Sequence, residues 1–159
     1  MKFHRASFIF LAAFSVLALS KCNRVGMEEE DYFQAFKDGK LWHGPAVAVR
    51  HENKLILRSR VLNKRGKWEE EVGFVFDFTA ERAYRIPNGE GYFSIIIGGD
   101  GIASSFYSFG SSSDEVVITE YDRKNQVIRG TCSLRAGNEF DQTQIVKFIS
   151  GRFRAKISN

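Results

Sequence analysis

The stretch Val72-Gly73-Phe74-Val75-Phe76-Asp77-Phe78 decides the fold class of this chain. Its apolar side chains recur at every second position, which is the period of a β-strand with one buried face. The residues at 72, 74, 76 and 78 would share that face, while Asp77 would point to solvent. The stretch therefore predicts a strand whose inner face is built mainly from aromatic rings.

The same alternation predicts strands along the rest of the chain. Near the C-terminus, Phe153, Ala155 and Ile157 alternate with three cations that we expect to face solvent, namely Arg152, Arg154 and Lys156. Comparable runs occupy residues 32–37, 46–50, 54–62, 92–97, 105–109, 115–121, 127–134 and 145–149. Two short helices stay open as alternatives, one over residues 27–37 and a single turn within residues 79–85.

Tight turns separate these runs. Asp38-Gly39, Asn88-Gly89 and Gly98-Gly99-Asp100-Gly101 supply residues that tolerate the positive φ angles of hairpins, so consecutive strands should pair antiparallel. Residues 98–101 lack the Lys-Ser/Thr and the helix of a phosphate-binding loop, and we interpret them as a turn. Closed or two-layered sheets protect the edges of so many strands. The predicted fold class is all-β, a single antiparallel β-sandwich or flattened barrel of about nine strands.

Two of the predicted strands are apolar on both faces. Residues 92–97 and 116–118 would either be covered on both sides or line an internal cavity. Four of the 15 Phe residues lie within the first 14 positions, and the other eleven are enough for a core with or without a pocket.

The N-terminus has the composition of a secretory signal peptide. Lys2 and Arg5 precede the uncharged residues 8–19, and this apolar run of about 12 residues is shorter than the ~20 needed to cross a bilayer. We therefore expect a signal segment at residues 1–20, a polar tether at 21–31 and one all-β domain at 32–159. The expected location is outside the cytoplasm, in the periplasm or the cell envelope.

Two processing routes are open for this leader. A signal peptidase could cut between Ser20 and Lys21, because Ala18 and Ser20 are small. The segment Leu19-Ser20-Lys21-Cys22 also resembles a bacterial lipobox, in which Cys22 becomes lipidated and anchors the protein to a membrane. Lys21 departs from that pattern, because a small residue is preferred immediately before the cysteine.

Cys22 and Cys132 are the two cysteines of the chain. They could form a disulfide in an oxidising compartment if Cys22 is not lipidated. Cys132 is in step with Ile128 and Leu134, so the alternative is a small buried thiol in the core. Their number and spacing exclude a cysteine-based zinc site.

Composition and charge limit the classes of function. With 43% hydrophobic and 26% charged residues, the chain falls in the range of folded globular domains. Loss of Lys2 and Arg5 with the leader would reduce the 23 basic residues to 21, against 19 acidic ones. The remaining charges alternate in sign along the sequence, so we expect no nucleic-acid partner.

Three stretches carry a resemblance to a known family. They are residues 33–42 (Phe-Gln-Ala-Phe-Lys-Asp-Gly-Lys-Leu-Trp), residues 116–122 running into 127–134, and residues 149–153 (Ile-Ser-Gly-Arg-Phe). The chain resembles a family of small, uncharacterised bacterial envelope lipoproteins with a β-sandwich or lipocalin-like domain, which usually has Phe where Cys132 stands. This resemblance implies export, an envelope location and an all-β fold, and it carries over no catalytic residue.

No set of residues forms a known catalytic or metal-binding motif. His43 and His51 are eight residues apart and are interpreted as surface or turn residues, and we expect no catalytic residue, metal or cofactor. A carboxylate pair for glycoside hydrolysis could come from Asp77 and residues 69–71 (Glu-Glu-Glu), but the three glutamates are more simply the solvated start of a strand. Four aromatic residues are either core or a sugar- or peptide-binding platform: Trp42, Trp68, Tyr84 and Tyr107.

The leading hypothesis is an exported, non-enzymatic binding or structural β-module. Its partner would be a protein, a glycan or a small apolar ligand, and it would contact the membrane only through a lipid anchor. The alternative is a carrier of a small hydrophobic ligand in a β-barrel cavity. A hydrolase is the third and weakest hypothesis.

Overall fold

The computed structural model describes residues 30–98 and 101–159, and all its regular structure is β-strand. The expected all-β fold class is therefore confirmed. The strands are β1 (Tyr32–Lys37), β2 (Lys40–Gly44), β3 (Ala46–His51), β4 (Lys54–Leu62), β5 (Trp68–Asp77), β6 (Ala83–Arg85), β7 (Gly91–Ile97), β8 (Gly101–Ser108), β9 (Glu115–Asp122), β10 (Val127–Asn138) and β11 (Ile145–Ser158).

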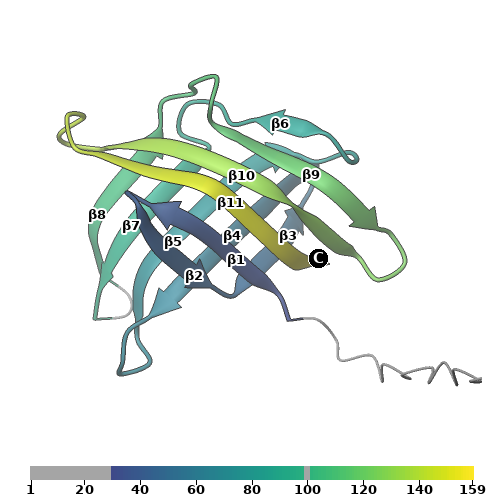
Figure 1. Ribbon diagram of the computed structural model, residues 1–159, viewed down its shortest axis with the longest axis horizontal. Coiled ribbons are helices and arrows are strands. Elements are labelled where there is room, and N and C mark those ends of the chain that lie inside the picture. Colours follow the sequence, from purple (N-terminus) through teal and green to yellow (C-terminus); the bar gives the residue numbers. More distant parts are fainter. Residues whose placement is uncertain (1–29, 99–100) are drawn as a thin grey trace, which may run out of the picture.

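The strands form one sheet that returns on itself. Its order is β2-β1-β11-β3-β4-β5-β7-β8-β10-β9-β6, and β11 also pairs with β10. A ring of strands therefore closes through β11, while the β1–β2 hairpin and the β9–β6 pair extend from it. In Figure 1, β10 and β11 cross one side of the molecule, with β3, β4 and β5 behind them. The result is a flattened barrel.

One pairing departs from the expected antiparallel order. Ile157 and Ser158 of β11 pair with Ala48 and Val49 of β3, and the two strands run parallel. Farther back along the same edge, β11 pairs with β1 from Phe148 to Arg154. Beyond the residues that pair with β1, Ile157 and Ser158 of β11 pair with β3 and close the ring. The two strands run in the same direction there, so this pairing is parallel.

The two helical alternatives are wrong for the residues that the structure describes. Residues 32–37 form β1, because its backbone pairs with β11 on one side and β2 on the other. Within residues 79–85, Ala83–Arg85 form β6, which pairs with β9. The spacing of Tyr32 and Phe36 suits a helix, but the unpaired edge of β11 offers a longer set of hydrogen bonds to a strand.

Aromatic rings from opposite walls meet inside the barrel. The ring of Phe33 on β1 lies 6.2 Å from that of Phe74 on β5, and Phe93 on β7 lies 5.5 Å from Phe148 on β11. Trp42 of β2 packs edge-on against Phe148 at 5.8 Å. These five side chains are at most 5% exposed. At this level the interior is filled by protein rings.

The alternation that predicted β5 is confirmed, whereas the C-terminal strand differs in one residue. Val72, Phe74 and Phe76 are buried and Asp77 is exposed. On β11, the expected solvent-facing Arg154 does lie on the outer wall, but its side chain is only 10% exposed. Its guanidinium forms an ion pair with Asp31, which precedes β1, so a charge partner allows this burial.

Candidate binding groove

The outer wall of β4, β5 and β7 carries two hollows that meet at Arg60 and Trp68. The larger, of about 260 Å³, is lined by Arg60, Trp68, Glu71, Tyr92, Ser94, Ile96 and Ile102. The smaller, of about 170 Å³, is lined by Pro45, Val47, Arg58, Ser59, Arg60 and Trp68. Because they share two residues, we treat them as one feature and name it the Trp68 groove.

Trp68 reaches the outer wall through a β-bulge. In the β4–β5 register Val61 pairs with Glu70 and Leu62 pairs with Trp68, so β5 holds one extra residue, Glu69. Strict alternation would turn Trp68 to the same side as Glu70, which faces the interior. The bulge re-aims the indole, which is partly exposed and lies 5.0 Å from Cζ of Arg60.

Glu71 is a buried carboxylate that organises the floor of the groove. The residue is 7% exposed, and one of its oxygens accepts a hydrogen bond of 2.6 Å from the Tyr92 hydroxyl. Its other oxygen accepts from Nε of Arg60. Burial, followed by the hydrogen bond to the Glu71 carboxylate, raises the pKa of Tyr92, so this hydroxyl stays protonated and remains a donor.

Gly73 makes room for Tyr92 on the same wall. Gly73 and Tyr92 are paired across β5 and β7. A Cβ atom at position 73 would lie 2.3 Å from Cζ of the Tyr92 ring, so the ring lies where a side chain would otherwise stand. The absence of a side chain at Gly73 lets Tyr92 reach Glu71, and Tyr92 in turn covers the bare glycine backbone.

Two guanidinium groups at the groove have N–H donors that are not bonded to other described residues. Arg58 and Arg60 are two residues apart on β4, so both belong to its outer face. Arg60 donates through Nε to Glu71, and no bond of its terminal nitrogens to another described residue is present. Arg58 forms no hydrogen bond or ion pair with any part of the chain that the structure describes. One carboxylate, Glu71, therefore stands against two cations, and the Trp68 indole lies next to Arg60.

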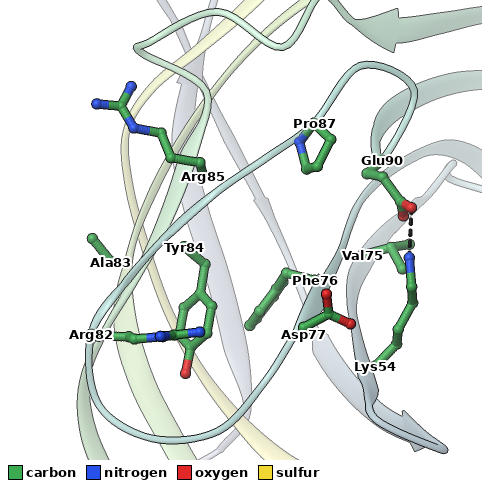
Figure 2. A pocket seen from close by; sticks show the side chains of 10 residues that line it. All are labelled: Lys54, Val75, Phe76, Asp77, Arg82, Ala83, Tyr84, Arg85, Pro87 and Glu90. Carbon is green, nitrogen blue, oxygen red and sulfur yellow. Dashed lines mark hydrogen bonds and ion pairs between the residues drawn. The ribbon is translucent and has the colours of Figure 1, made fainter.

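Another hollow lies beside the ion pair of Lys54 and Glu90. Its volume is about 330 Å³, and Figure 2 shows the ten residues that line it. Lys54 Nζ lies 2.6 Å from Oε1 of Glu90, and Cζ of Arg82 lies 4.7 Å from the ring centre of Tyr84. Arg85 points away from Lys54 and donates to the carbonyl of Ser112. The two aromatic residues of this hollow, Phe76 and Tyr84, are 4% and 5% exposed, so it offers a ligand less aromatic surface than the Trp68 groove.

The four aromatic residues that were either core or a platform do not lie together. Trp42 and Tyr84 are both 5% exposed and belong to the core, whereas Trp68 and Tyr107 are on the outer wall. His43 and His51 are exposed, in β2 and at the end of β3. No group of three or more metal-ligating side chains occurs among the residues described. The sequence did not indicate Arg58, Arg60 and Tyr92, because their relation depends on the register of three strands.

The expected solvated run of glutamates is wrong for two of its three members. Glu69 is exposed, but Glu70 faces the interior, where it accepts a 2.7 Å hydrogen bond from Trp42 Nε1 and pairs with Lys37. Glu71 is held by Arg60 and Tyr92. Each buried carboxylate has found donors, so its burial leaves no charge unpaired. Asp77 lines the hollow of Figure 2 and not the Trp68 groove, so the structure does not bring it together with Glu71 at one site.

The residues expected to take part in processing lie outside the described part of the chain: Ser20, Lys21 and Cys22. Cys132 is described, and its thiol is free and buried. It packs against Gly151, where a Cβ atom would lie 2.4 Å from Sγ of Cys132. Burial raises the pKa of this thiol above its ordinary value of 9.0.

No described helix is long and apolar enough to cross a membrane. Comparison with known proteins found no matching family model, no matching curated protein and no matching solved structure. The function is therefore argued from the geometry of this chain alone.

Proposed function

We propose that this protein is an exported, non-enzymatic binding module and that the Trp68 groove binds a saccharide bearing a carboxylate. The single observation that carries the proposal is the Trp68 indole, turned outward by a bulge and set beside two arginines with free donors. A sugar ring has an apolar C–H face that suits an aromatic surface, and its hydroxyl edge suits polar neighbours. The floor of the groove meets both needs with Ile96, Ile102 and Ser94.

The charge of the groove favours an acidic sugar over a neutral one. Arg60 is partly neutralised by Glu71, while Arg58 keeps a whole positive charge. Guanidinium groups bind carboxylates with two parallel hydrogen bonds, which adds direction as well as attraction. A uronic acid unit would therefore place its ring against Trp68 and its carboxylate towards Arg58 and the terminal nitrogens of Arg60.

The arrangement supports binding more than catalysis. Glycoside hydrolysis uses two carboxyl groups on either side of the scissile bond, one of them free to exchange a proton. In the Trp68 groove both oxygens of Glu71 are occupied, by Arg60 and by Tyr92. The carrier alternative has less support than a surface site, because rings from opposite walls meet in the barrel interior.

Titration calorimetry of the mature domain with uronate-containing oligosaccharides tests the proposal. The same oligosaccharides with their carboxyl groups reduced to alcohols serve as neutral ligands. We expect Trp68→Ala to weaken binding of both by about tenfold or more. Arg58→Gln should weaken only the acidic ligand, also by about tenfold, because it removes a charged hydrogen bond.

Phe140→Ala provides the matched control, because Phe140 is 90% exposed and lies outside the groove. It should leave both affinities unchanged. Equal affinity for the acidic and reduced ligands would refute the acidic specificity, and failure to bind either would refute the site. Turnover of the oligosaccharide that a single carboxylate variant abolishes would refute the non-enzymatic assignment.

A further inference from the structure

A row of exposed apolar side chains crosses three strands on another part of the outer wall. Phe36 of β1 pairs with Leu41 of β2 on one side and with Ile149 of β11 on the other. These residues are 43%, 61% and 53% exposed, although two of them are aliphatic residues inside strands. Their register makes them one continuous strip and not three scattered contacts. We name the strip and its surroundings the Phe36 face.

A bulge in β11 opens a hollow beside this strip. Gln34 pairs with Arg152 and Phe36 with Ile149, so β11 holds an extra residue opposite Ala35. Ser150 lies there with a positive φ of 52°, and both Ile149 and Ser150 are exposed. The resulting hollow, of about 170 Å³, is lined by Gln34, Ala35, Phe36, Ser150 and Arg152. Its polar side chains are an amide, a hydroxyl and a guanidinium, all of which can donate to an anion.

The charges around the Phe36 face are mainly positive, although the exposed carboxylate of Asp38 also lies there and accepts a 2.9 Å hydrogen bond from the backbone N–H of Lys147. Lys40 is adjacent to Leu41, and Lys147 precedes Ile149 by two residues on the same strand; both are exposed. In the β10–β11 register Lys147 lies directly opposite Arg135, so two like charges face each other. None of Lys40, Arg135, Lys147 and Arg152 forms an ion pair with another residue of the described chain. Like charges in such a pair cost stability unless an anion lies near them.

From this combination we infer that the Phe36 face docks on an anionic phospholipid surface. Phe36, Leu41 and Ile149 would enter the interface between headgroups and acyl chains, and the hollow beside Phe36 would receive a phosphate against Arg152 and Ser150. Lys40, Lys147 and Arg135 would add attraction from the surrounding negative lipids. A second copy of the chain is a poorer occupant, because two faces of the same positive sign would be brought together. This inference does not depend on any ligand of the Trp68 groove.

Vesicle co-sedimentation of the mature protein tests the Phe36 face. Cys22 is replaced by serine in this protein, so that no lipid anchor contributes to the binding. We expect binding to vesicles of phosphatidylcholine mixed with phosphatidylglycerol, and much weaker binding to phosphatidylcholine alone. Lys147→Gln with Arg152→Gln should lower the partition coefficient about 25-fold, since each cation near the surface contributes about fivefold. Leu41→Ser with Ile149→Ser should lower it by about tenfold or more.

The matched control is Leu62→Ser with Ile97→Ser, at the ends of β4 and β7, where the two side chains are 48% and 66% exposed. This control removes as much exposed apolar surface and should keep the binding of the parent protein. A thermal melt of each variant shows that it is folded before its binding is compared.

Four results would overturn the inference. One is equal binding to neutral and anionic vesicles, and another is a control pair that weakens binding as much as Leu41→Ser with Ile149→Ser. The third is a dimer in sedimentation velocity that Leu41→Ser dissociates, which would assign the face to a second copy. If calorimetry detects glycerol phosphate in the hollow while vesicles do not bind, the site takes a soluble phosphate and the membrane surface is refuted.

Discussion

Nε1 of Trp42 donates a 2.7 Å hydrogen bond to Oε2 of Glu70, a carboxylate that points from β5 into the barrel. The other oxygen of Glu70 pairs with Lys37, whose Nζ also lies 4.9 Å from the ring centre of Phe93. Trp42 and Lys37 belong to the β1–β2 hairpin, which extends from the ring of strands. This polar contact therefore ties the hairpin to the barrel wall, in addition to the rings that pack around it.

Glu70→Gln should destabilise the domain by about 1–3 kcal/mol. The amide oxygen can still accept from Trp42, but the half-buried Lys37 loses its counter-charge. Urea unfolding should show a lower midpoint with an unchanged slope. Glu69→Gln is the control and should change stability by less than about 0.5 kcal/mol, because Glu69 is exposed.

The double variant Lys37→Met with Glu70→Gln distinguishes an unpaired charge from a loss of packing. If the unpaired lysine causes the loss, the double variant should be more stable than Glu70→Gln alone. A double variant that is as unstable as the sum of the two single variants would contradict this explanation.

Gly73→Ala should cost about 1–3 kcal/mol and disturb the Trp68 groove. The new methyl would meet the Tyr92 ring at 2.3 Å, so either β5 or the ring must move. In a double-mutant cycle with Tyr92→Ala, the cost of Gly73→Ala should fall, because the ring that blocks the methyl is gone. If the losses of unfolding free energy from Gly73→Ala and Tyr92→Ala simply add in the double variant, the glycine is required for a reason other than room for the Tyr92 ring.

Sequence periodicity was sufficient to predict which side chains of β5 are buried, because Val72, Phe74 and Phe76 alternate without interruption. It failed at Trp68, four residues earlier on the same strand, because the extra residue at Glu69 reverses the side of the sheet. Such a bulge depends on how β4 and β5 align, and no local pattern encodes that alignment. The groove was missed for the same reason.

Composition alone also could not separate core aromatics from surface ones. Trp42 and Trp68 both have polar residues within two positions in the sequence, yet Trp42 is 5% exposed and Trp68 lines an open hollow. The partner of Arg154 was likewise not predictable, since Asp31 is more than 120 residues away and meets it only through the β1–β11 pairing.

Cys132 should make the stability of the domain fall at alkaline pH. Burial raises the pKa of the folded thiol above its ordinary value of 9.0, so above pH 9 the unfolded state releases a proton that the folded state keeps. The free energy of unfolding then decreases with pH, by about 1.4 kcal/mol per pH unit for this one group. With Cys22 replaced by serine in both proteins, urea unfolding between pH 8 and 10.5 should show a shallower decline for Cys132→Ala, by roughly that slope.

The two tryptophans should differ in their fluorescence if the bulge at Glu69 sets the side of Trp68. In Trp42→Phe the remaining emission comes from Trp68, which is partly exposed, so acrylamide should quench it readily and its maximum should lie at longer wavelength. In Trp68→Phe the remaining emission comes from Trp42, which is 5% exposed, and quenching should be weak.

Insertion of one serine between Val61 and Leu62 of β4, in the Trp42→Phe background, then tests the cause. With a partner for Glu69 on β4, the bulge is lost and strict alternation would turn Trp68 to the interior side of the sheet, the side of Glu70. The emission should move to shorter wavelength and quenching by acrylamide should fall, while circular dichroism keeps the β-sheet spectrum. Unchanged quenching in a folded insertion variant would mean that the turn at residues 63–67, and not the bulge, holds Trp68 on the outer wall.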